Sequence, residues 1–410
     1  MPSIEQRSFR MKNALRLMLA TSLLAGCGTS NLSLNLTKGS EVVKAEAVQG
    51  RLLVKFKSDA DRLAFHKNHN SRTLKRIAAL NIDVVQVPGS RGVAIQDANA
   101  VYAEPDYLYQ VSFEPNDPSY KDQYALKNMS AAQAWEINQG DPKVVIAIID
   151  TGVDLDHSDL KDKLVDGFNA VEPSKSPDDD NSHGTHCAGI SAASTNNNFG
   201  ISGLASGCKV MPIKVMTAQG SGSTSSIAEG ITWAVDHGAK VISMSLGGPG
   251  GGQAMGDAVK YALAKNVSVV AAMGNNGTNQ MSYPAAYPGV IAVGATDNLD
   301  KIAKFSQFGT WISVAAPGVG IYSTTPNHDN YLNKTYPDKI TKNFSLMSGT
   351  SMATPYVAGL AGLVRSQFPN LNPAQIKERI EKSCDRVQGL VAFDDRYGHG
   401  RVNAQKALSN

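Results

Sequence analysis

Five continuous apolar runs constrain the fold of this 410-residue chain more than any other feature. They span residues 143–149, 210–215, 241–244, 267–272 and 290–293. None shows the regular apolar–polar alternation of a half-exposed strand, so each is typical of a parallel strand covered on both faces. Helical patterns separate the runs, at residues 184–193, 225–237 and 253–265. This order predicts an α/β fold with a doubly wound parallel sheet and helices on both faces.

A smaller domain is predicted before this region. Residues 51–57 and 82–87 have the pattern of strands, residues 59–69 that of a helix, and residues 100–109 form a further extended segment. A β–α–β–β order of this kind predicts a small α+β domain over residues 49–112. The Pro/Asn/Asp cluster that follows indicates a linker, and the large domain is assigned to residues 113–410.

The N-terminus has the pattern of an export signal. Basic residues precede a short apolar run at residues 17–25, which is too short to span a membrane permanently. The run ends in Leu24-Ala25-Gly26-Cys27, which resembles a bacterial lipobox. This predicts a signal peptide at residues 1–26, a lipid on Cys27, and a flexible Ser/Asn/Thr/Lys-rich tether over residues 27–48. An ordinary secretory signal cleaved at another bond is the alternative.

Charge and cysteine content limit the partners. A net charge of +3 and a pI near 8.5 are too mild to predict binding to nucleic acid or to an anionic membrane surface. If Cys27 carries a lipid, three cysteines remain: Cys187, Cys208 and Cys384. Three is an odd number, so at least one is a free thiol and no complete disulfide framework is expected.

Ser351 lies at the start of an apolar run of small residues. As a helix, residues 357–364 would be apolar on all sides, which predicts burial in the centre of the large domain. Proline is tolerated in the first turn of a helix, so Pro355 places Ser351 at or near the helix N-terminus. Free N–H groups and the positive end of the helix dipole there favour a group that becomes an oxyanion. A helix-capping serine is the simpler alternative.

Three other polar residues follow predicted strands or open a predicted helix. Asp150 closes the first apolar run, His183 precedes the first helix, and Asn275 follows the run at 267–272. In doubly wound sheets, catalytic groups collect at the carboxyl ends of the strands. A nucleophilic serine needs a histidine to take its proton, an acid to orient that histidine, and a donor for the oxyanion. All four types of group are present.

Three motifs carry a family resemblance, and they occur in a fixed order: Asp150-Thr-Gly, His183-Gly-Thr-His, and Gly349-Thr-Ser-Met-Ala-Thr-Pro. They resemble those of the subtilisin-like serine proteases, and residues 128–410 look most similar to thermitase-like members. The resemblance implies that Asp150, His183 and Ser351 are the catalytic triad. It also implies that Asn275 and the Ser351 backbone N–H form the oxyanion hole. The segment expected to pair with the substrate backbone is Ser245, Leu246 and Gly247.

The same resemblance implies a structural Ca²⁺ ion at the Asn-rich turn 195–201. Its ligands would be the carboxylates of Asp117 and Asp159, the side chain of Asn197, and the backbone carbonyls of Thr195, Phe199 and Ile201. Such oxygen ligands suit a hard cation. An Asn-rich turn without metal is the alternative. A zinc site at His183, His186 and Cys187 is a weaker alternative, because no fourth ligand is apparent.

The small domain resembles a subtilase propeptide, which inhibits the protease and is cut off by it; a permanent accessory domain is the alternative. The expected function is therefore an exported serine endopeptidase that acts on proteins and peptides and is made as a zymogen. We expect a monomer whose precursor is held at a membrane only through the Cys27 lipid, with a periplasmic or extracellular mature enzyme. The rival hypothesis is a catalytically silent, lipid-anchored binding protein with the same fold.

Overall fold

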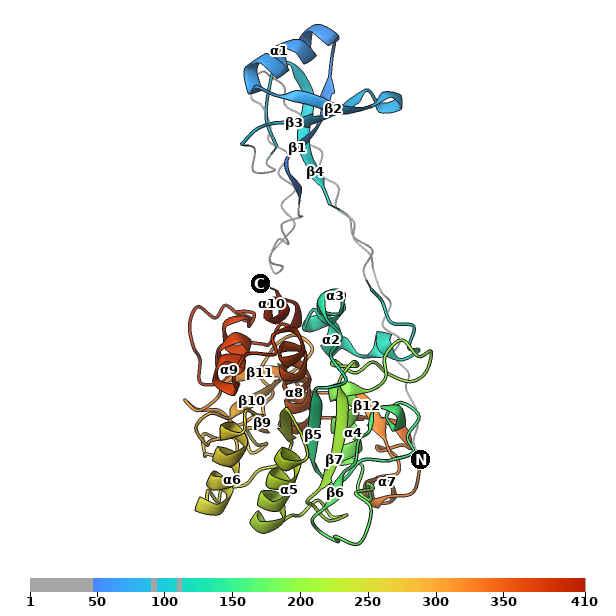
Figure 1. Ribbon diagram of the computed structural model, residues 1–410, viewed down its shortest axis with the longest axis vertical. Helices are drawn as coiled ribbons and strands as arrows, with labels where there is room; N and C mark the ends of the chain where they lie inside the picture. Colours follow the sequence, from blue (N-terminus) through green and yellow to red (C-terminus); the bar gives the residue numbers. More distant parts are fainter. Residues whose placement is uncertain (1–46, 90–93, 109–112, 410) are drawn as a thin grey trace, which may run out of the picture. The chain divides into compact units, whose positions relative to one another are not determined.

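The computed structural model describes residues 47–89, 94–108 and 113–409. Its contacts divide the chain into two units, Met1–Gln110 and Val111–Asn410, which are described separately (Figure 1). This boundary lies two residues before the one predicted from the sequence. The predicted signal peptide, Cys27 and nearly all of the predicted tether fall outside the described residues. Within the described ranges, no helix has both the length and the apolar character needed to cross a bilayer.

The first unit is an antiparallel sheet with one helix. Its elements are β1 (Ala47–Phe56), α1 (Asp59–His69), β2 (Arg72–Ile77), the 3₁₀ turn η1 (Ala78–Leu80), β3 (Ile82–Gln86) and β4 (Ala100–Tyr107). The strand order is β2-β3-β1-β4. Alternate residues of β1 are buried, and Leu52 and Phe56 form a core with Phe65 of α1. The predicted small α+β domain is therefore present, with one strand more than expected.

The strand missing from the prediction is β2. Most of its side chains are exposed, and it pairs only with β3, at the edge of the sheet. Such a strand has no apolar alternation, so the sequence Arg-Thr-Leu-Lys-Arg-Ile carries no periodic pattern. Charged side chains are common on edge strands, where they oppose pairing with other molecules.

The second unit contains a seven-stranded sheet with the order β11-β10-β9-β8-β5-β7-β6. The strands are β5 (Val145–Asp150), β6 (Phe168–Asn169), β7 (Lys209–Lys214), β8 (Val241–Met244), β9 (Ser268–Ala272), β10 (Ile291–Thr296) and β11 (Val314–Pro317). Every pairing between them is parallel. The predicted doubly wound sheet is confirmed. Because β5, β8 and β9 are adjacent and parallel, their carboxyl ends lie next to one another.

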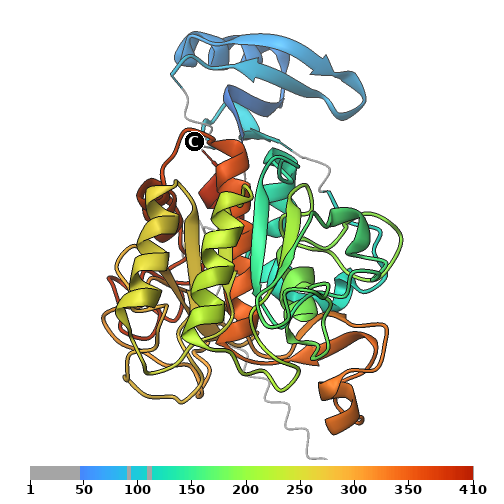
Figure 2. The same cartoon turned by 60° about the horizontal axis from the view of Figure 1, so that its bottom comes forward.

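Helices cover both faces of this sheet. One face packs against α4 (His183–Ala192) and α8 (Thr350–Gln367), and the other against α5 (Thr224–Asp236) and α6 (Gln253–Ala264). Figures 1 and 2 show α5 and α6 side by side. Ile146 and Ile148 of β5 point into the first layer, and Ala147 and Ile149 point into the second. Burial on both faces explains why the strand sequences are continuously apolar.

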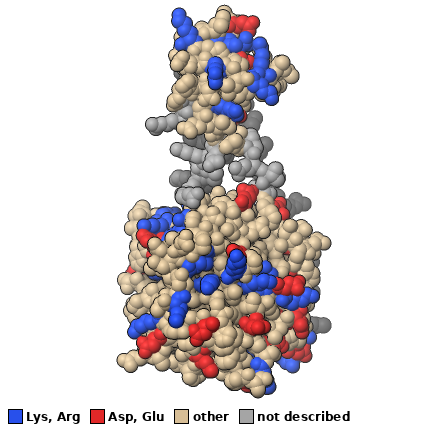
Figure 3. Space-filling view, viewed as in Figure 1, with Lys and Arg blue, Asp and Glu red and all other residues tan. Residues whose placement is uncertain are grey.

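Shorter elements complete the second unit. They are η2 (Tyr120–Asp122), α2 (Tyr124–Asn128), α3 (Ala131–Ile137), η3 (Lys161–Lys163), α7 (Tyr331–Thr335), α9 (Pro373–Lys382) and α10 (Ala404–Leu408). Strands β12 (Ile321–Thr325) and β13 (Asn343–Met347) form a separate antiparallel pair. Basic and acidic side chains are interspersed on the face of this unit seen in Figure 3.

The prediction for Pro355 needs a correction. The sequence predicts it in the first turn of its helix, but α8 begins at Thr350 and Pro355 is its sixth residue, in the second turn. Proline has no N–H, so the Ser351 carbonyl, four residues earlier, receives no helical hydrogen bond from it. Ser245 Oγ donates to that carbonyl instead (2.8 Å), as does Cys187 Sγ (3.5 Å). Donors from two other segments thus compensate for proline inside the helix.

Candidate active site

Asp150 and His183 form a hydrogen-bonded pair at the carboxyl end of β5, an interior strand of the sheet. Asp150 is the last residue of β5 and is fully buried, and His183 is the first residue of α4. His183 Nδ1 donates to Asp150 Oδ1 at 2.7 Å, and Thr151 N donates to the same oxygen at 2.8 Å. With the proton held on Nδ1, the Nε2 lone pair of a neutral His183 is free to accept another proton.

Opposing effects set the pKa of His183. Burial by itself lowers the pKa of this imidazole, but the Asp150 carboxylate and the nearby Cys187 raise it more. The net pKa of His183 lies well above the ordinary value of 6.5. Cys187 is itself fully buried, and burial raises the pKa of its thiol. The site therefore stabilises the imidazolium ion. This is the form that His183 adopts when it acts as a base and takes a proton.

Ser351 lies in the same cleft but has a different hydrogen-bond partner. It is the second residue of α8, so the prediction of a helix N-terminal position is correct. Its Oγ donates to the backbone carbonyl of Ser245 at 3.0 Å, not to His183. Catalytic hydrogen bonds are often unmade in proteins without substrate. A rotation about the Cα–Cβ bond would release the hydroxyl from that carbonyl.

Asn275 is fixed against the residue before the serine. Its Oδ1 accepts hydrogen bonds from Thr350 N (2.9 Å) and Thr350 Oγ1 (3.0 Å). The Nδ2 donors therefore lie on the opposite side of the amide, and Asn275 lines the cleft. The preceding Gly274 has φ +105°, and a Cβ there would lie 1.9 Å from Gln307 Oε1. Only glycine allows the chain to turn here and present the amide.

The cleft has a volume of about 540 Å³. His183, Ser351, Asn275 and the predicted substrate-binding residues line it together; the latter are Ser245, Leu246 and Gly247. The arrangement has a potential nucleophile, a proton acceptor with an orienting acid, and amide donors around one open space. This is the set of groups that acyl transfer requires.

Comparisons with known proteins decide the family. The profile of the Subtilase family matches residues 141–400, which is more than half of the chain. This chain belongs to the subtilase family. A second profile, the fervidolysin N-terminal prodomain, matches residues 37–105.

Similar proteins extend the match over both units. The thermophilic serine proteinase of Bacillus sp. (strain AK1) is 39% identical over 381 residues, which cover 89% of each chain. Thermitase of Thermoactinomyces vulgaris is 44% identical over 297 residues, covering 72% of this chain and 99% of thermitase. The crystal structure of fervidolysin from Fervidobacterium pennivorans aligns with a TM-score of 0.62 and 30% identity, covering 90% of this chain and 62% of fervidolysin. The subtilase is therefore a thermitase-like serine endopeptidase with an N-terminal prodomain.

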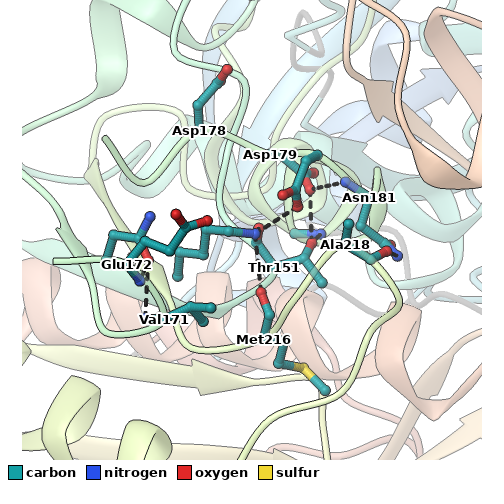
Figure 4. Close-up of polar contacts among 12 residues, drawn as sticks. Thr151, Val171, Glu172, Asp178, Asp179, Asn181, Met216 and Ala218 are labelled. Carbon is teal, nitrogen blue, oxygen red and sulfur yellow. Dashed lines mark hydrogen bonds and ion pairs between the residues drawn. The ribbon is translucent and has the colours of Figure 1, made fainter. Parts of the chain in front are cut away.

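The structure of this subtilase also identifies a residue that the sequence analysis missed. Asp179 is the middle residue of three adjacent acids, Asp178-Asp179-Asp180, yet it is fully buried. Its carboxylate accepts five hydrogen bonds, from Thr151 Oγ1 (2.9 Å), Asn181 N (2.9 Å), Ser182 N (3.1 Å), Thr185 N (3.0 Å) and Thr185 Oγ1 (2.6 Å). Figure 4 shows Asp179 between Thr151 and Asn181. The carboxylate thus ties the end of β5 to the loop that leads into His183.

A buried lysine supports the same region. Lys214, at the end of β7, donates from Nζ to Thr151 O (2.7 Å), Met216 O (3.0 Å) and Asp180 Oδ1 (2.6 Å). Because Thr151 directly follows Asp150, these contacts hold the chain that carries the acid. Neither Asp179 nor Lys214 belongs to a motif that indicates its role. The three adjacent acids just before His183 are the one sequence feature that could have indicated a supporting residue in this loop.

The predicted calcium ligands gather around one turn. Asp117 accepts hydrogen bonds from the backbone N of Asn196 and of Asn197, and Asp159 accepts from Asn197 Nδ2 (2.9 Å) and Ile201 N (3.0 Å). Thr195 and Phe199 lie on the same turn. A Cβ on Gly200, whose φ is +53°, would lie 2.0 Å from Asp159 Oδ2. The turn can therefore approach that carboxylate closely only with glycine at this position.

The charges of this turn fit a cation. Asp159 is fully buried, Asp117 is nearly so, and within the described ranges no Lys, Arg or His lies within ion-pair distance of either. Burial is the main cause that raises the pKa of Asp159 to about 6. A bound cation would compensate for both carboxylates, and oxygen atoms of the turn would be the further ligands that Ca²⁺ prefers.

Of the three residues of the zinc alternative, only His183 and Cys187 lie together, with Nδ1 and Sγ 4.0 Å apart. His186 Nε2 donates to the carbonyls of Ile321 and Ser345, both at 3.1 Å, which turns this ring toward the β12–β13 pair. His183 Nδ1 is occupied by Asp150. In the part of the chain that the structure describes, Cys187, Cys208 and Cys384 are all buried thiols and none is in a disulfide.

Proposed function

We propose that this subtilase is an exported endopeptidase made as a zymogen, in which Asp150, His183 and Ser351 hydrolyse peptide bonds through an acyl-enzyme. The observation that supports it most is the Asp150–His183 hydrogen bond of 2.7 Å, which leaves Nε2 available beside the cleft that Ser351 lines. The serine of such a pair becomes nucleophilic only when a neighbouring base removes its proton.

The first half of the reaction forms the acyl-enzyme. Ser351 Oγ leaves the Ser245 carbonyl and attacks the substrate carbonyl carbon, and its proton passes to His183 Nε2. Asp150 stabilises the resulting imidazolium and keeps its orientation. Asn275 Nδ2 and the Ser351 backbone N–H donate to the developing oxyanion. His183 then gives its proton to the leaving amine, which departs as the tetrahedral intermediate collapses.

Water completes the cycle. His183 Nε2 takes a proton from a water molecule that attacks the acyl carbonyl, and it returns this proton to Ser351 Oγ as the acid product leaves. Ser245, Leu246 and Gly247 follow β8 and line the cleft, where their backbone would pair with an extended substrate. Recognition by backbone pairing suits protein and peptide substrates of varied sequence.

The test of this function is Ser351→Ala in the full-length chain, with the exposed Ser174→Ala as matched control. Casein hydrolysis should disappear in the first variant and remain in the second, and only the first should accumulate uncut precursor. Normal maturation of pure Ser351→Ala would contradict self-cleavage. Wild-type protein without hydrolytic activity would favour the rival hypothesis, a catalytically silent, lipid-anchored binding protein.

The prodomain and the N-terminal segment support a model of release. We infer that residues 49–112 inhibit the enzyme until the linker is cut, and that a lipid on Cys27 holds the precursor at a membrane. Because Cys27 precedes the prodomain, the cut would separate the lipid from residues 113–410 and free an active monomer in the periplasm or outside the cell. Labelled palmitate should then mark the precursor and the small fragment but never the mature enzyme, and Cys27→Ser should remove the label.

A structural Ca²⁺ ion is also part of the proposal. Asp117, Asp159, the Asn197 side chain and the backbone carbonyls of Thr195, Phe199 and Ile201 would hold it. Two buried carboxylates with no cationic side chain beside them in the described part of the chain support this assignment. The ion would supply no chemistry to the reaction and would stabilise the folded state by mass action.

A further inference from the structure

The connection between β12 and β13, residues 326–342, contains the short helix α7. Asn330 caps this helix: its side chain accepts from Asn333 N, and the Asn333 side chain accepts from Asn330 N. The reciprocal bonds give α7 a defined start although it is only five residues long. The helix therefore presents its first residues in a fixed orientation.

These first residues attach to the loop that carries the catalytic histidine. Each of the four residues that precede His183 makes one hydrogen bond to residues 328–332. Three of them accept through their carbonyls: Asp179 O from His328 Nε2 (3.0 Å), Asp180 O from Tyr331 N (2.9 Å) and Asn181 O from Leu332 N (3.2 Å); the fourth donates, from Ser182 Oγ to Asn330 Oδ1 (2.8 Å). Three of the four use backbone atoms of the loop, so they depend little on its side chains. The position of α7 relative to His183 is thus set by direct contacts.

Leu332 is the residue of α7 that reaches the cleft. It is half-buried and lines the same space as His183, Asn181 and Met216. Met216 packs against the hydrophobic layer that contains α5 and α6, whereas Leu332 belongs to none of the three hydrophobic clusters of the described residues. An apolar side chain at the cleft that is held by backbone hydrogen bonds, and not by core packing, is available to contact a substrate.

We propose that Leu332 is a specificity-determining residue of this protease. Together with Met216, it forms an apolar wall on the His183 side of the cleft, and this wall favours substrates with a large apolar side chain at the one position that lies against it. The proposal rests on the proposed function, because it takes the cleft as the place where the substrate binds. Leu332 contacts the substrate side chain and takes no part in the chemistry at Ser351.

The wall predicts opposite outcomes for two substitutions. In Leu332→Ala the backbone N–H remains, so the bond to Asn181 O is retained while the apolar contact is lost. The value of kcat/KM should fall about tenfold for peptides with Leu or Phe at the sensitive position and by less than about twofold for Ala. In Leu332→Glu a carboxylate replaces the apolar surface, and peptides with Lys or Arg at that position should become the preferred ones.

The experiment is a peptide library varied at one position at a time, cleaved by mature enzyme. Lys334→Ala is the matched control, since this exposed lysine on the same helix does not line the cleft. Equal changes for all peptides would show that α7 acts only through the His183 loop, and unchanged preferences would show that Leu332 does not contact substrate; either result overturns the inference. Active wild-type protein and inactive Ser351→Ala in the same assay keep this test separate from that of the proposed function.

Discussion

Replacing Asp179 by Asn should weaken both the fold and the catalysis of this protease. The side chain keeps its size, and Oδ1 of the new amide can still accept from Thr151 Oγ1, Asn181 N and Ser182 N. An NH₂ group takes the place of Oδ2, which accepts from Thr185 N and Thr185 Oγ1 in the wild-type protein. Thr185 N then faces a donor instead of an acceptor, inside a site where Asp179 is fully buried.

The size of the effect follows from these contacts. One buried N–H without an acceptor costs about 1–3 kcal/mol, and three bonds that change from a charged to a neutral acceptor lose about 1 kcal/mol each. The variant no longer buries a charge, which offsets part of this loss. We expect the free energy of unfolding to fall by about 3 kcal/mol. For a domain of this size this corresponds to a decrease in Tm of roughly 5–10 °C.

Catalysis should suffer because the same carboxylate holds the loop before His183. Small displacements of a catalytic group reduce the rate strongly, and about 1 Å can cost about 10²-fold. We expect kcat to fall by at least about tenfold with little change in KM. The unfolding measurement is made in the Ser351→Ala background to prevent autolysis, and the kinetic measurement in otherwise wild-type enzyme.

The matched control is Asp166→Asn, because Asp166 is exposed. Its effect should stay within about 0.5 kcal/mol, as for most surface substitutions. If Asp179→Asn unfolds at the same temperature as this control and keeps its kcat, the five hydrogen bonds do not position His183, and the reasoning is refuted.

Three further predictions concern the proposed oxyanion hole, the base and the metal. Asn275→Ala should lower kcat with KM nearly unchanged; loss of such a donor costs subtilisin about 10²–10³ in kcat, and a loss below about threefold would exclude this role. Because only neutral His183 accepts a proton and its pKa is raised well above 6.5, activity should fall on the acid side of that raised pKa. A pH–rate profile of Asp150→Asn should show residual activity with this acid limb moved to lower pH, and an unmoved limb would contradict the pairing. EDTA should speed thermal inactivation, Asp159→Ala should do the same and abolish the response to added Ca²⁺, and the stabilisation by Ca²⁺ should weaken as pH falls through about 6, where Asp159 becomes protonated. Identical inactivation rates in EDTA and in excess Ca²⁺ would exclude the metal site.

The sequence alone determined the class of fold and the family, because both depend on local patterns. A strand buried on both faces must be apolar along its whole length, so β5, β8 and β9 were visible as runs. The short motifs around Asp150, His183 and Ser351 are contiguous in the chain and so needed no tertiary information. The roles proposed for these residues follow from the same motifs and await the experiments above.

Only the tertiary structure decided which distant groups support this site. The compensation for Pro355 depends on a hydroxyl from Ser245, more than a hundred residues away in the chain. The contact of Leu332 with the His183 loop likewise joins two segments that no sequence pattern links. Hydrogen bonds of this kind need a donor and an acceptor in reach but no periodicity, so a single sequence does not display them. A single sequence does not display burial either. In the sequence Asp179 is one of three adjacent acids, and only the folded structure shows that it is the one that is fully buried.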